Sequence, residues 1–371
     1  MEPQETPKVK IGVAAGPEAT MIEDARRVSD LLRGATLEIE TEEKLAHDLG
    51  VAGTPLKKLD VDLLLVIGSD RTLLNTLLKL GKREIPILPV ASMGQPDFLF
   101  DVTVSNLQSI VGDLLKRRWT EDRRTRLEVK LNGLESPPVL NELAVFARTS
   151  ATLIRYSLLL DGELVWKDSS DGLLIATPTG STAYSMSVGG PVVLRTAPVF
   201  SVVPVNSANP ARKALIVSDK TVIGVQGITS GVTVEAVLDG QIRRPIEGAS
   251  IEVSRSDYDA VFVKLTAERV AALQGKLQKR TEALETIAHE LPPSAKLVLK
   301  VLEYHEQMTQ REIIDETKLP ARTVRHAMAI LISEGLVTKR LSLRDSRQGL
   351  FCVAKPGASR STGTDRVGPD T

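Results

Sequence analysis

The chain has 371 residues, and its 47 lysines and arginines balance its 47 aspartates and glutamates, so its formal net charge is zero. Apolar residues make up 42% of the chain and aromatic residues only 3%. This composition is typical of a soluble globular protein of about two or three domains. It excludes a wholly basic nucleic-acid coat protein, an acidic solvating tail protein and a collagenous or low-complexity chain.

Cysteine and histidine usage argues against disulfides and structural zinc. Cys352 is the single cysteine and the four histidines are scattered, so neither a disulfide nor a zinc cluster is expected. Residues 1–10 lack the basic and apolar regions of a signal peptide, and no stretch approaches about 18 apolar residues. We therefore expect a cytoplasmic protein without a membrane segment.

Strand and helix patterns alternate in the first part of the chain. Apolar runs predict strands at 9–14, 61–67 and 85–90, and helical spacing predicts helices at 18–33 and 73–80. This alternation predicts an α/β domain at residues 8–125, with an open parallel sheet and helices on its faces. A mixed helical domain is the alternative.

From about residue 126 the pattern changes to short strands separated by turns. The turn signals are Asn132-Gly133, Asp161-Gly162 and Asp239-Gly240, and apolar runs flank the last two as hairpins require. Residues 126–266 are therefore predicted to form a β-rich domain. Its expected strands are 127–131, 140–146, 153–160, 172–176, 200–205, 214–217, 221–225, 232–238 and 260–265.

Helical periodicity returns in the C-terminal part. Apolar residues at near-heptad spacing predict a linker helix at 267–291, whose stripe either packs on the protein or forms a coiled coil. Residues 292–355 are predicted to form three helices and then a hairpin of strands 336–341 and 349–353, an order that resembles a winged helix-turn-helix. Residues 356–371 are predicted to be a disordered tail.

Two glycine-containing segments indicate nucleotide binding. The turn Gly68-Ser69-Asp70-Arg71-Thr72 lies between a predicted strand and a predicted helix, where backbone N–H groups bind phosphates, although an ordinary helix N-cap explains Asp70 as well. Residues 171–191 read DGLLIATPTGSTAYSMSVGGP. Their many hydroxyl groups and glycines suit a ligand with ribose hydroxyls and an adenine edge.

In these residues the chain resembles the NAD kinase family, over about residues 8–265. The matching segments are the turn at Asp70 (family G-G-D-G-T), Asn141-Glu142 (N-E), Asp171-Gly172 with 177–191 (the longest signature), Asp239-Gly240-Gln241 (D-G-Q), Arg126-Leu127-Glu128-Val129 (R-L-x-V) and, faintly, Met93-Gly94 with Phe98-Leu99. The TPTGSTAY run at 177–184 is highly specific.

The resemblance implies transfer of a phosphoryl group from ATP, or from polyphosphate, to the 2′-hydroxyl of the adenosine ribose of NAD, giving NADP, with Mg²⁺ on the phosphates. Asp70 would be the catalytic residue, because it would accept the proton of that hydroxyl or orient it. Asp171 would meet the nicotinamide end. The implied NAD and ATP contacts are Gly68, Arg71, Thr72, Asn141, Glu142, Asp171, Thr182, Ala183, Tyr184, Ser187 and Gln241. No dedicated metal cage is expected, and a homo-oligomer is implied.

Several positions depart from the family pattern. Ser69 and Arg71 replace glycines of the turn, and Arg71 either pairs with a phosphate or obstructs the phosphate donor. We expect retained activity, and the alternative is an NAD(P)-sensing transcription regulator with impaired catalysis. A lipid or sugar kinase is disfavoured by the run at 177–184. Ser169 and Asp97 also depart, which leaves the choice between NAD and NADH open.

The C-terminal module has a local excess of positive charge. The stretch from Lys318 to Arg347 contains seven basic residues and only two acidic ones. The module is therefore predicted to bind DNA, through bases or phosphates at the third helix and through phosphates at the wing. The expected contacts are Arg322, Arg325, Lys339, Arg340, Arg344 and Arg347. The alternative is a dimerisation module with a solvated basic face.

Overall fold

The computed structural model describes residues 9–35, 37–92, 98–149, 151–246, 248, 250–265, 292–304, 308–333, 336–341 and 349–353. The chain divides into two compact units, Met1–Val270 and Ala271–Thr371, and each is described by itself. Some expected features lie outside the described residues: the linker helix 267–291, the tail 356–371, Gly335, Arg344, Arg347, and Met93, Gly94 and Asp97 of the 93–99 segment.

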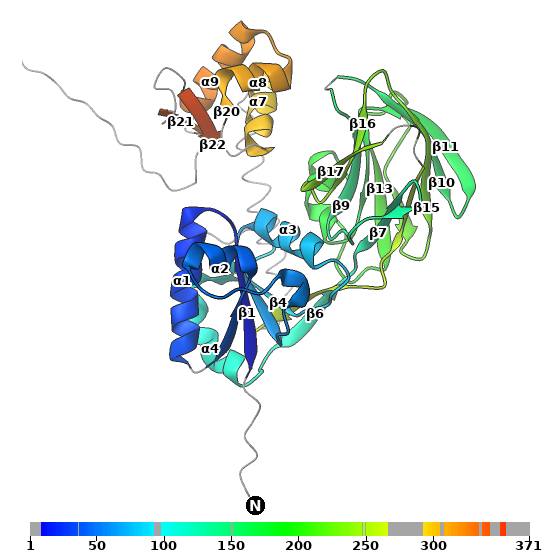
Figure 1. Ribbon diagram of the computed structural model, residues 1–371. Helices are drawn as coiled ribbons and strands as arrows, with labels where there is room; N and C mark the ends of the chain where they lie inside the picture. The colour runs from blue at the N-terminus through cyan, green and yellow to red at the C-terminus, as the bar shows by residue number, and fades with distance from the viewer. Residues whose placement is uncertain are drawn as a thin grey trace, which may run out of the picture. The chain divides into compact units, whose positions relative to one another are not determined.

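The first unit contains an open sheet with helices around it (Figure 1). Its strands are β1 (Lys10–Ala15), β2 (Glu38–Thr41), β3 (Leu63–Gly68), β4 (Ile87–Ala91), β5 (Val102–Thr103), β6 (Thr120–Arg124) and β19 (Ala260–Lys264). Its helices are α1 (Ala19–Gly34), α2 (Glu43–Leu49), α3 (Asp70–Leu80) and α4 (Leu107–Leu115), with 3₁₀ turns η1 (Leu56–Lys58) and η2 (Val104–Asn106). The strand order is β2-β1-β3-β4-β19-β6, with β5 beside β4.

Alternating side chains of β3 bury both faces of this sheet, as its unbroken apolar run predicts. Leu63 and Leu65 join the core cluster that holds apolar residues of α1 and α4. Leu64 and Val66 join the opposite cluster, which holds the leucines of α3. The expected α/β domain is confirmed, and the helices cover both faces of a sheet that is parallel except at β6.

A sandwich of two antiparallel six-stranded sheets follows, which confirms the expected β-rich part. Its strands are β7 (Leu127–Leu131), β8 (Leu134–Glu135), β9 (Glu142–Ala147), β10 (Ile154–Leu160), β11 (Glu163–Ser170), β12 (Gly172–Ala176), β13 (Val199–Val205), β14 (Leu215–Ser218), β15 (Ile223–Thr229), β16 (Val234–Leu238), β17 (Ile242–Ile246) and β18 (Ile251–Arg255). The short helices η3 (Gly180–Thr182) and α5 (Tyr184–Ser187) follow β12. The sheet orders are β11-β10-β15-β18-β7-β8 and β14-β13-β12-β9-β16-β17, and one continuous core lies between them.

The three predicted turns are confirmed. Each pairs a non-glycine residue at positive φ with a glycine at positive φ, and at Asp239 and Gly240 these angles are 49° and 67°. Two successive residues in this conformation form the tight hairpin turns whose twist matches that of antiparallel strands. The same arrangement joins β10 to β11 and β7 to β8.

The last strand of the first unit differs from its expected place. The sequence groups 260–265 with the β-rich part, but β19 pairs with β4 and β6 in the open sheet. The sequence also gives no sign of β6, because its residues Thr120–Arg124 are polar and charged and show no apolar alternation. Pairing with a distant strand, rather than local pattern, decides both placements.

Within its described residues, the second unit has three helices and a three-stranded sheet. The elements are α7 (Pro293–Tyr304), β20 (Met308–Thr309), α8 (Gln310–Thr317), α9 (Ala321–Ser333), β21 (Val337–Leu341) and β22 (Gly349–Val353), with the sheet order β20-β22-β21. Thr309 and Glu312 form a capping box at the start of α8. One apolar cluster, which includes Val298, Ile313 and Leu331, joins the three helices.

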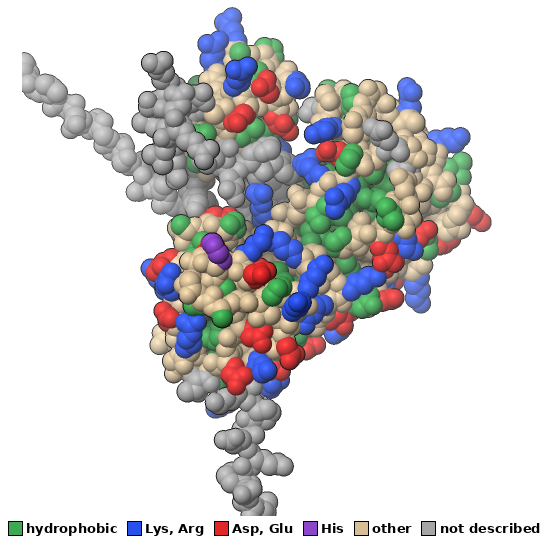
Figure 2. All heavy atoms as spheres, in the orientation of Figure 1, with side chains coloured by type: hydrophobic (Ala, Val, Ile, Leu, Met, Phe, Trp, Pro, Cys, Tyr) green, Lys and Arg blue, Asp and Glu red, His purple; other side chains and the backbone are tan. Residues whose placement is uncertain are grey.

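Acidic and basic side chains are interspersed on the visible face of the α/β part (Figure 2), in keeping with the zero net charge of the whole chain. Among the described residues, no helix is long and apolar enough to cross a membrane.

Candidate functional site

Asp70 lies where β3 ends and α3 begins. It is the first residue of α3, and its Oδ1 accepts the backbone N–H of Leu99 at 2.9 Å. The carboxyl ends of parallel strands and the first turns of the following helices meet at one edge of an open sheet, where such folds bind ligands. Asp70 is therefore held at that edge by a hydrogen bond from a neighbouring segment.

The backbone around Asp70 is compact and presents N–H groups. Gly68 has a φ of 154°, and a Cβ there would lie 2.5 Å from Thr72 Oγ1. A Cβ at Gly16, just after β1, would lie 2.8 Å from the same oxygen. Within the described residues, the N–H groups of Arg71 and Thr72 have no acceptor. The first turn of α3 is therefore suited to an anion.

Arg71 does not strain the turn. It is the second residue of α3, is exposed, and is not among the residues with positive φ. Ser69 is the N-cap, with φ −120° and ψ 174°, which any residue adopts. Position 71 is helical and does not require glycine.

A second group of predicted residues lies at the start of β9. The buried carboxylate of Asp239 accepts the N–H groups of Leu140, Asn141 and Glu142 at 2.9, 2.7 and 3.2 Å. The Asp239 N–H in turn donates to the Glu142 carbonyl at 3.0 Å. Burial raises the pKa of the Asp239 carboxyl to about 6, while the three N–H donors and Arg126 act to lower it.

The TPTG turn that follows β12 packs against the same backbone. Thr177 donates from its N–H to the Asn141 carbonyl at 2.9 Å and from its hydroxyl to the Leu140 carbonyl at 2.5 Å. A Cβ at Gly180 would overlap the carbonyl oxygen of Asn141. Two distant segments, one ending β12 and one ending β16, therefore hold residues 140–142 in one conformation.

The Asn141 side chain carries an unused hydrogen-bond acceptor. Asn141 is 8% exposed, and within the described residues its buried Oδ1 has no hydrogen-bond partner. The buried hydroxyl of Ser185 in α5 also has no hydrogen-bond partner within the described residues. Buried polar atoms of this kind are uncommon in a folded protein and usually have a partner that the protein does not itself supply.

Four of the expected contacts lie on η3, on α5 or at Ala183, the residue between these two helices. Thr182 is buried and its hydroxyl donates to the Thr179 carbonyl at 3.2 Å, while Ala183 is half-buried and Ser187 is exposed. The Tyr184 ring stacks on Phe146 of β9, with 5.8 Å between ring centroids. This stacking ties the hydroxyl-rich segment to the strand that begins with Glu142.

Gln241 follows the Asp239-Gly240 turn at the edge of the same region. Its Nε2 donates to the Asp239 carbonyl at 3.2 Å, and its backbone N–H donates to Leu238 at 2.9 Å. The side chain is half-buried. Gln241 is thus placed beside residues 140–142 by the turn that also presents the Asp239 carboxylate.

Asp171 lies apart from these residues within the chain. It precedes β12, whereas Thr177 follows it, so about six extended residues place the two roughly 20 Å apart. Asn206 Nδ2 donates to the Asp171 carboxylate at 2.9 Å. Nearby Ser169, Ala208 and Asn209 line a cavity of about 550 Å³ on the sandwich.

The two predicted groups approach each other through Leu140. This residue begins the Asn141-Glu142 segment of the sandwich, yet its side chain is fully buried in the apolar cluster that contains Leu73 and Leu74 of α3. The helix that starts with Asp70 and the segment that carries Asn141 therefore share one core. The site lies between the open sheet and the sandwich, within the first unit.

Known proteins match most of this chain. The family model for the ATP-NAD kinase C-terminal domain matches residues 140–265. An NAD kinase of Methanothermobacter thermautotrophicus is 35% identical over 274 residues, which are 72% of this chain and 96% of that protein. An NAD kinase of Syntrophotalea carbinolica is 34% identical over 267 residues, 69% of this chain and 93% of that protein. The chain belongs to the NAD kinase family.

Solved structures agree with this membership. The NAD kinase of Archaeoglobus fulgidus in complex with ATP is 27% identical, with a TM-score of 0.60 over 72% of this chain and 98% of that chain. Yeast NADH kinase complexed with NADH has a TM-score of 0.66 over 74% of this chain and 89% of that chain. At 21% identity this second likeness shows the fold alone. As a member of the NAD kinase family, the chain is an enzyme of the transferase class.

The sequence analysis missed the role of one NAD kinase residue. Asp239 was assigned to a hairpin turn and to the D-G-Q match but to no contact, whereas its carboxylate organises the Asn141-Glu142 segment. A signal was available, because an aspartate directly after a fully buried strand needs hydrogen-bond donors. The backbone N–H groups that supply them lie about 100 positions earlier in the chain, and no local pattern reveals them.

Four of the six expected basic contacts outside the NAD kinase match lie among the described residues, two on α9 and two on β21. Arg322 and Arg325 are exposed on α9 three residues apart, so both lie on one face of the helix. Lys339 and Arg340 lie on β21, opposite Phe351 and Leu350 of β22.

Proposed function

We propose that this chain phosphorylates the 2′-hydroxyl of the adenosine ribose of NAD, giving NADP, with ATP or polyphosphate as the phosphoryl donor. One observation carries the proposal: Asp70 stands at the first turn of α3, beside a loop that buries the unpartnered Oδ1 of Asn141. The family membership supports the same reaction, since the similar proteins of known name are NAD kinases.

Asp70 is the proposed catalytic residue. The hydrogen bond from the Leu99 N–H fixes its carboxylate, which then accepts the proton of the 2′-hydroxyl or orients that hydroxyl toward the donor phosphate. Phosphoryl transfer depends mainly on positioning and on neutralising charge. A fixed carboxylate at a helix start that binds phosphates meets the first requirement.

The first turn of α3 is the proposed phosphate site. The N–H groups of Arg71 and Thr72 point along the positive end of the helix dipole. The exposed guanidinium of Arg71 adds a charge-assisted fork for a phosphate. Gly68 allows the chain to turn tightly enough to bring these groups to the sheet edge.

The dinucleotide would be recognised by the sandwich. We assign ribose or adenine contacts to Asn141, whose Oδ1 accepts from a ligand donor, and to Glu142. The polar groups of η3, α5 and the Asp239 turn supply the remaining contacts; these are Thr182, Ala183, Tyr184, Ser187 and Gln241. A contact of Asp171 with the nicotinamide end stays a prediction, as does the choice between NAD and NADH.

The site suits a Mg²⁺ ion that arrives on the phosphates. No cluster of three or more histidine, cysteine or carboxylate side chains exists among the described residues. Protein ligands would therefore come from single carboxylates, Asp70 or Glu142, as is usual for Mg²⁺ bound together with phosphates. The ion would neutralise phosphate charge during transfer.

The structure of the turn favours the kinase over a catalytically impaired NAD(P)-sensing regulator. That alternative depended on Arg71 straining or blocking the phosphate turn. Because Arg71 is helical and exposed, it needs no glycine-like conformation. Arg71 therefore puts no backbone strain on the turn, and its charge can bind a phosphate.

For the second unit we propose a winged helix-turn-helix that binds DNA. Three helices and a hairpin follow one another in the order of such domains, and α9 presents Arg322 and Arg325 on one exposed face. We further propose three domains: residues 8–125 completed by β19, the sandwich at 126–259, and residues 292–355. A homo-oligomer stays a prediction.

The kinase proposal is tested by measuring NADP formation from NAD by the purified full-length protein, with ATP or polyphosphate as donor and Mg²⁺ present. NADP is expected with at least one donor. If neither donor yields NADP from NAD or NADPH from NADH, although the protein is folded and binds the dinucleotide, the proposal is wrong.

A further inference from the structure

Two segments join the open sheet to the sandwich, and they run side by side. Residues 125–126 lead from β6 to β7, and residues 256–259 lead from β18 back to β19; we call them together the hinge. Arg124 pairs with Ala260 on one side of the hinge, and Leu127 pairs with Arg255 on the other. Within the hinge, the Ser256 N–H donates to the Arg126 carbonyl at 2.9 Å.

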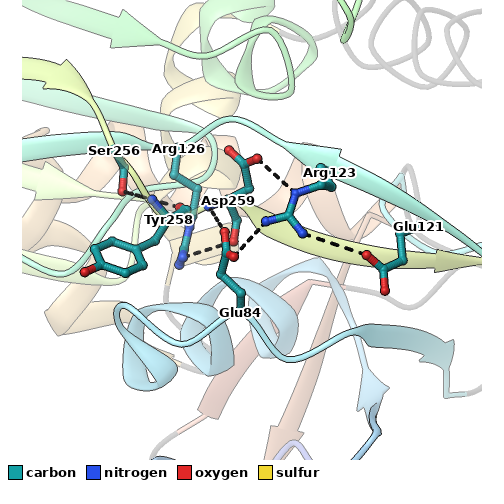
Figure 3. Close-up of polar contacts among 7 residues, drawn as sticks. All are labelled: Glu84, Glu121, Arg123, Arg126, Ser256, Tyr258 and Asp259. Atoms are coloured by element: carbon teal, nitrogen blue, oxygen red, sulfur yellow. Dashed lines mark hydrogen bonds and ion pairs between the residues drawn. The ribbon is translucent and has the colours of Figure 1, made fainter.

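The side chain of Arg126 is fully buried inside this hinge. Its guanidinium donates to three backbone carbonyls: Nε to Tyr258 at 2.7 Å, Nη2 to Asp259 at 3.1 Å and Nη1 to Gly81 at 2.9 Å. Two of these carbonyls belong to the returning hinge segment, and the third belongs to the C-cap of α3. One side chain thus ties both crossing segments to the end of that helix. Figure 3 shows its contacts with the returning segment.

The charge of Arg126 fits this place. Burial lowers the pKa of Arg126 to about 10, so the group remains protonated near neutral pH. The carbonyls at the end of α3 carry the negative end of its dipole, which a cation stabilises. The planar fork of an arginine reaches three carbonyls at once, whereas a lysine ammonium on a flexible stem offers a single charged point.

A more exposed layer of ion pairs reinforces the contact. Glu84, four residues after α3 ends, accepts the Asp259 N–H at 2.6 Å and an Arg123 N–H at 2.7 Å. Arg123 also lies 3.3 Å from the Asp259 carboxylate (Figure 3). Two sets of contacts therefore hold the end of α3 and the segment after it to the hinge. The hydrogen bonds of Arg126 are buried, and the contacts of Glu84 with Arg123 and Asp259 are more exposed.

These contacts fix how the two halves of the proposed site meet. Helix α3 is a rod of 11 residues, about 16 Å long, with Asp70 at one end and the Gly81 cap at the other. The sandwich carries Asn141, and the hinge is its covalent link to the open sheet. Any tilt of α3 relative to the hinge would move Asp70 away from Asn141.

We propose that Arg126 is a positioning residue, which sets the placement of Asp70 against the Asn141-Glu142 segment by joining the hinge to the end of α3. Its kinetic consequence rests on the proposed function, but its structural consequence does not. A displacement of about 1 Å at a reacting group costs on the order of 100-fold in rate. The effect should therefore reach the reaction although Arg126 touches no substrate.

The test compares Arg126→Lys, which keeps the charge and loses the fork, with Arg123→Lys in the exposed layer. Backbone hydrogen exchange is measured in the full-length protein. In Arg126→Lys we expect faster exchange at residues 70–80 and 140–142 and unchanged exchange in β12, and a kcat lower by about 10- to 100-fold with a smaller change in KM. Arg123→Lys should change neither quantity appreciably.

Uniformly faster exchange over the whole first unit, or unchanged exchange at residues 70–80, would overturn the proposal. If Arg126→Lys does not fold, Arg126→Gln, which removes the buried charge and keeps one NH₂ donor, is measured in the same way, and the same localised increase in exchange is expected. If the wild-type protein makes no NADP, the kinase proposal fails, while the exchange pattern still decides the role of Arg126.

Discussion

The carboxylate of Asp239 accepts the backbone N–H of Asn141 at 2.7 Å, across 98 positions of the chain. A residue that closes a hairpin of the sandwich therefore also fixes the segment in which Asn141 and Glu142 begin β9. Thr177 holds the opposite side of that segment, because its N–H and hydroxyl donate to the carbonyls of Asn141 and Leu140. The three motifs at Asn141, Thr177 and Asp239 thus act as one structural unit.

Replacing Asp239 with asparagine should lower turnover by about 10-fold or more, because an amide has one acceptor oxygen and turns an NH₂ group toward N–H donors. Steady-state kinetics measure this. As a control for the change of charge, Asp113→Asn on the exposed face of α4 should leave kcat and KM unchanged. A fully active Asp239→Asn enzyme would show that the three hydrogen bonds do not position the site.

The stability difference between the wild type and Asp239→Asn should depend on pH. Burial raises the folded-state pKa of Asp239 from 3.8 to about 6, so the stability contributed by protonation is present below about pH 4 and is lost as the pH rises through 6. The unfolding free energy of the wild type minus that of Asp239→Asn should therefore fall by about 2 kcal/mol between pH 4 and 7. Denaturant unfolding at both pH values measures it. A difference that does not change with pH contradicts the assignment.

Gly180→Ala should destabilise the protein by about 1–3 kcal/mol and reduce activity, because the new methyl group would overlap the carbonyl oxygen of Asn141. Gly112→Ala is the matched control, since Gly112 lies within α4 with no atom near the added methyl group. That change should raise stability by about 1 kcal/mol. Equal effects of the two substitutions in thermal unfolding would refute the close packing at Gly180.

Arg71→Ala should raise KM for the phosphoryl donor about tenfold and leave the unfolding free energy within about 0.5 kcal/mol, because Arg71 is exposed. Arg26→Ala, on the exposed side of α1, is the control and should leave KM unchanged. If Arg71→Ala instead increases kcat strongly, Arg71 obstructs the donor, and the regulator alternative becomes the better explanation.

Binding of mixed-sequence duplex DNA should weaken steeply as salt rises. Combined Arg322→Ala and Arg325→Ala changes should weaken binding and reduce the salt slope by about one for each phosphate that the protein no longer neutralises. The control is Arg33→Ala at the end of α1. Retention of DNA by a protein lacking residues 291–371 would show that the second unit is not the DNA-binding part.

Local sequence pattern predicted the elements that bury continuous apolar runs, such as β3, and the turns that need two residues at positive φ, such as Asp239-Gly240. It did not predict the polar strand β6 or the return of β19 to the open sheet, because pairing between distant strands decides both. The fork of Arg126 was equally hidden, since its three acceptors lie 45 to 133 positions away.

The candidate site was predictable as a set of motifs and not as a geometry. The residue types at Asp70, Asn141 and Thr177 indicate nucleotide chemistry. Whether position 71 requires glycine depends on where α3 begins, and a one-residue difference at a helix start cannot be derived from propensity alone.

The central claim, that Asp70 acts on the ribose hydroxyl in a phosphoryl transfer, is tested most directly by measuring NADP formation by the wild type and by Asp70→Asn, with dinucleotide binding measured in parallel. The account predicts NADP formation by the wild type and a kcat lower by about 100- to 10,000-fold in Asp70→Asn, with binding retained. An unchanged rate in Asp70→Asn would contradict it.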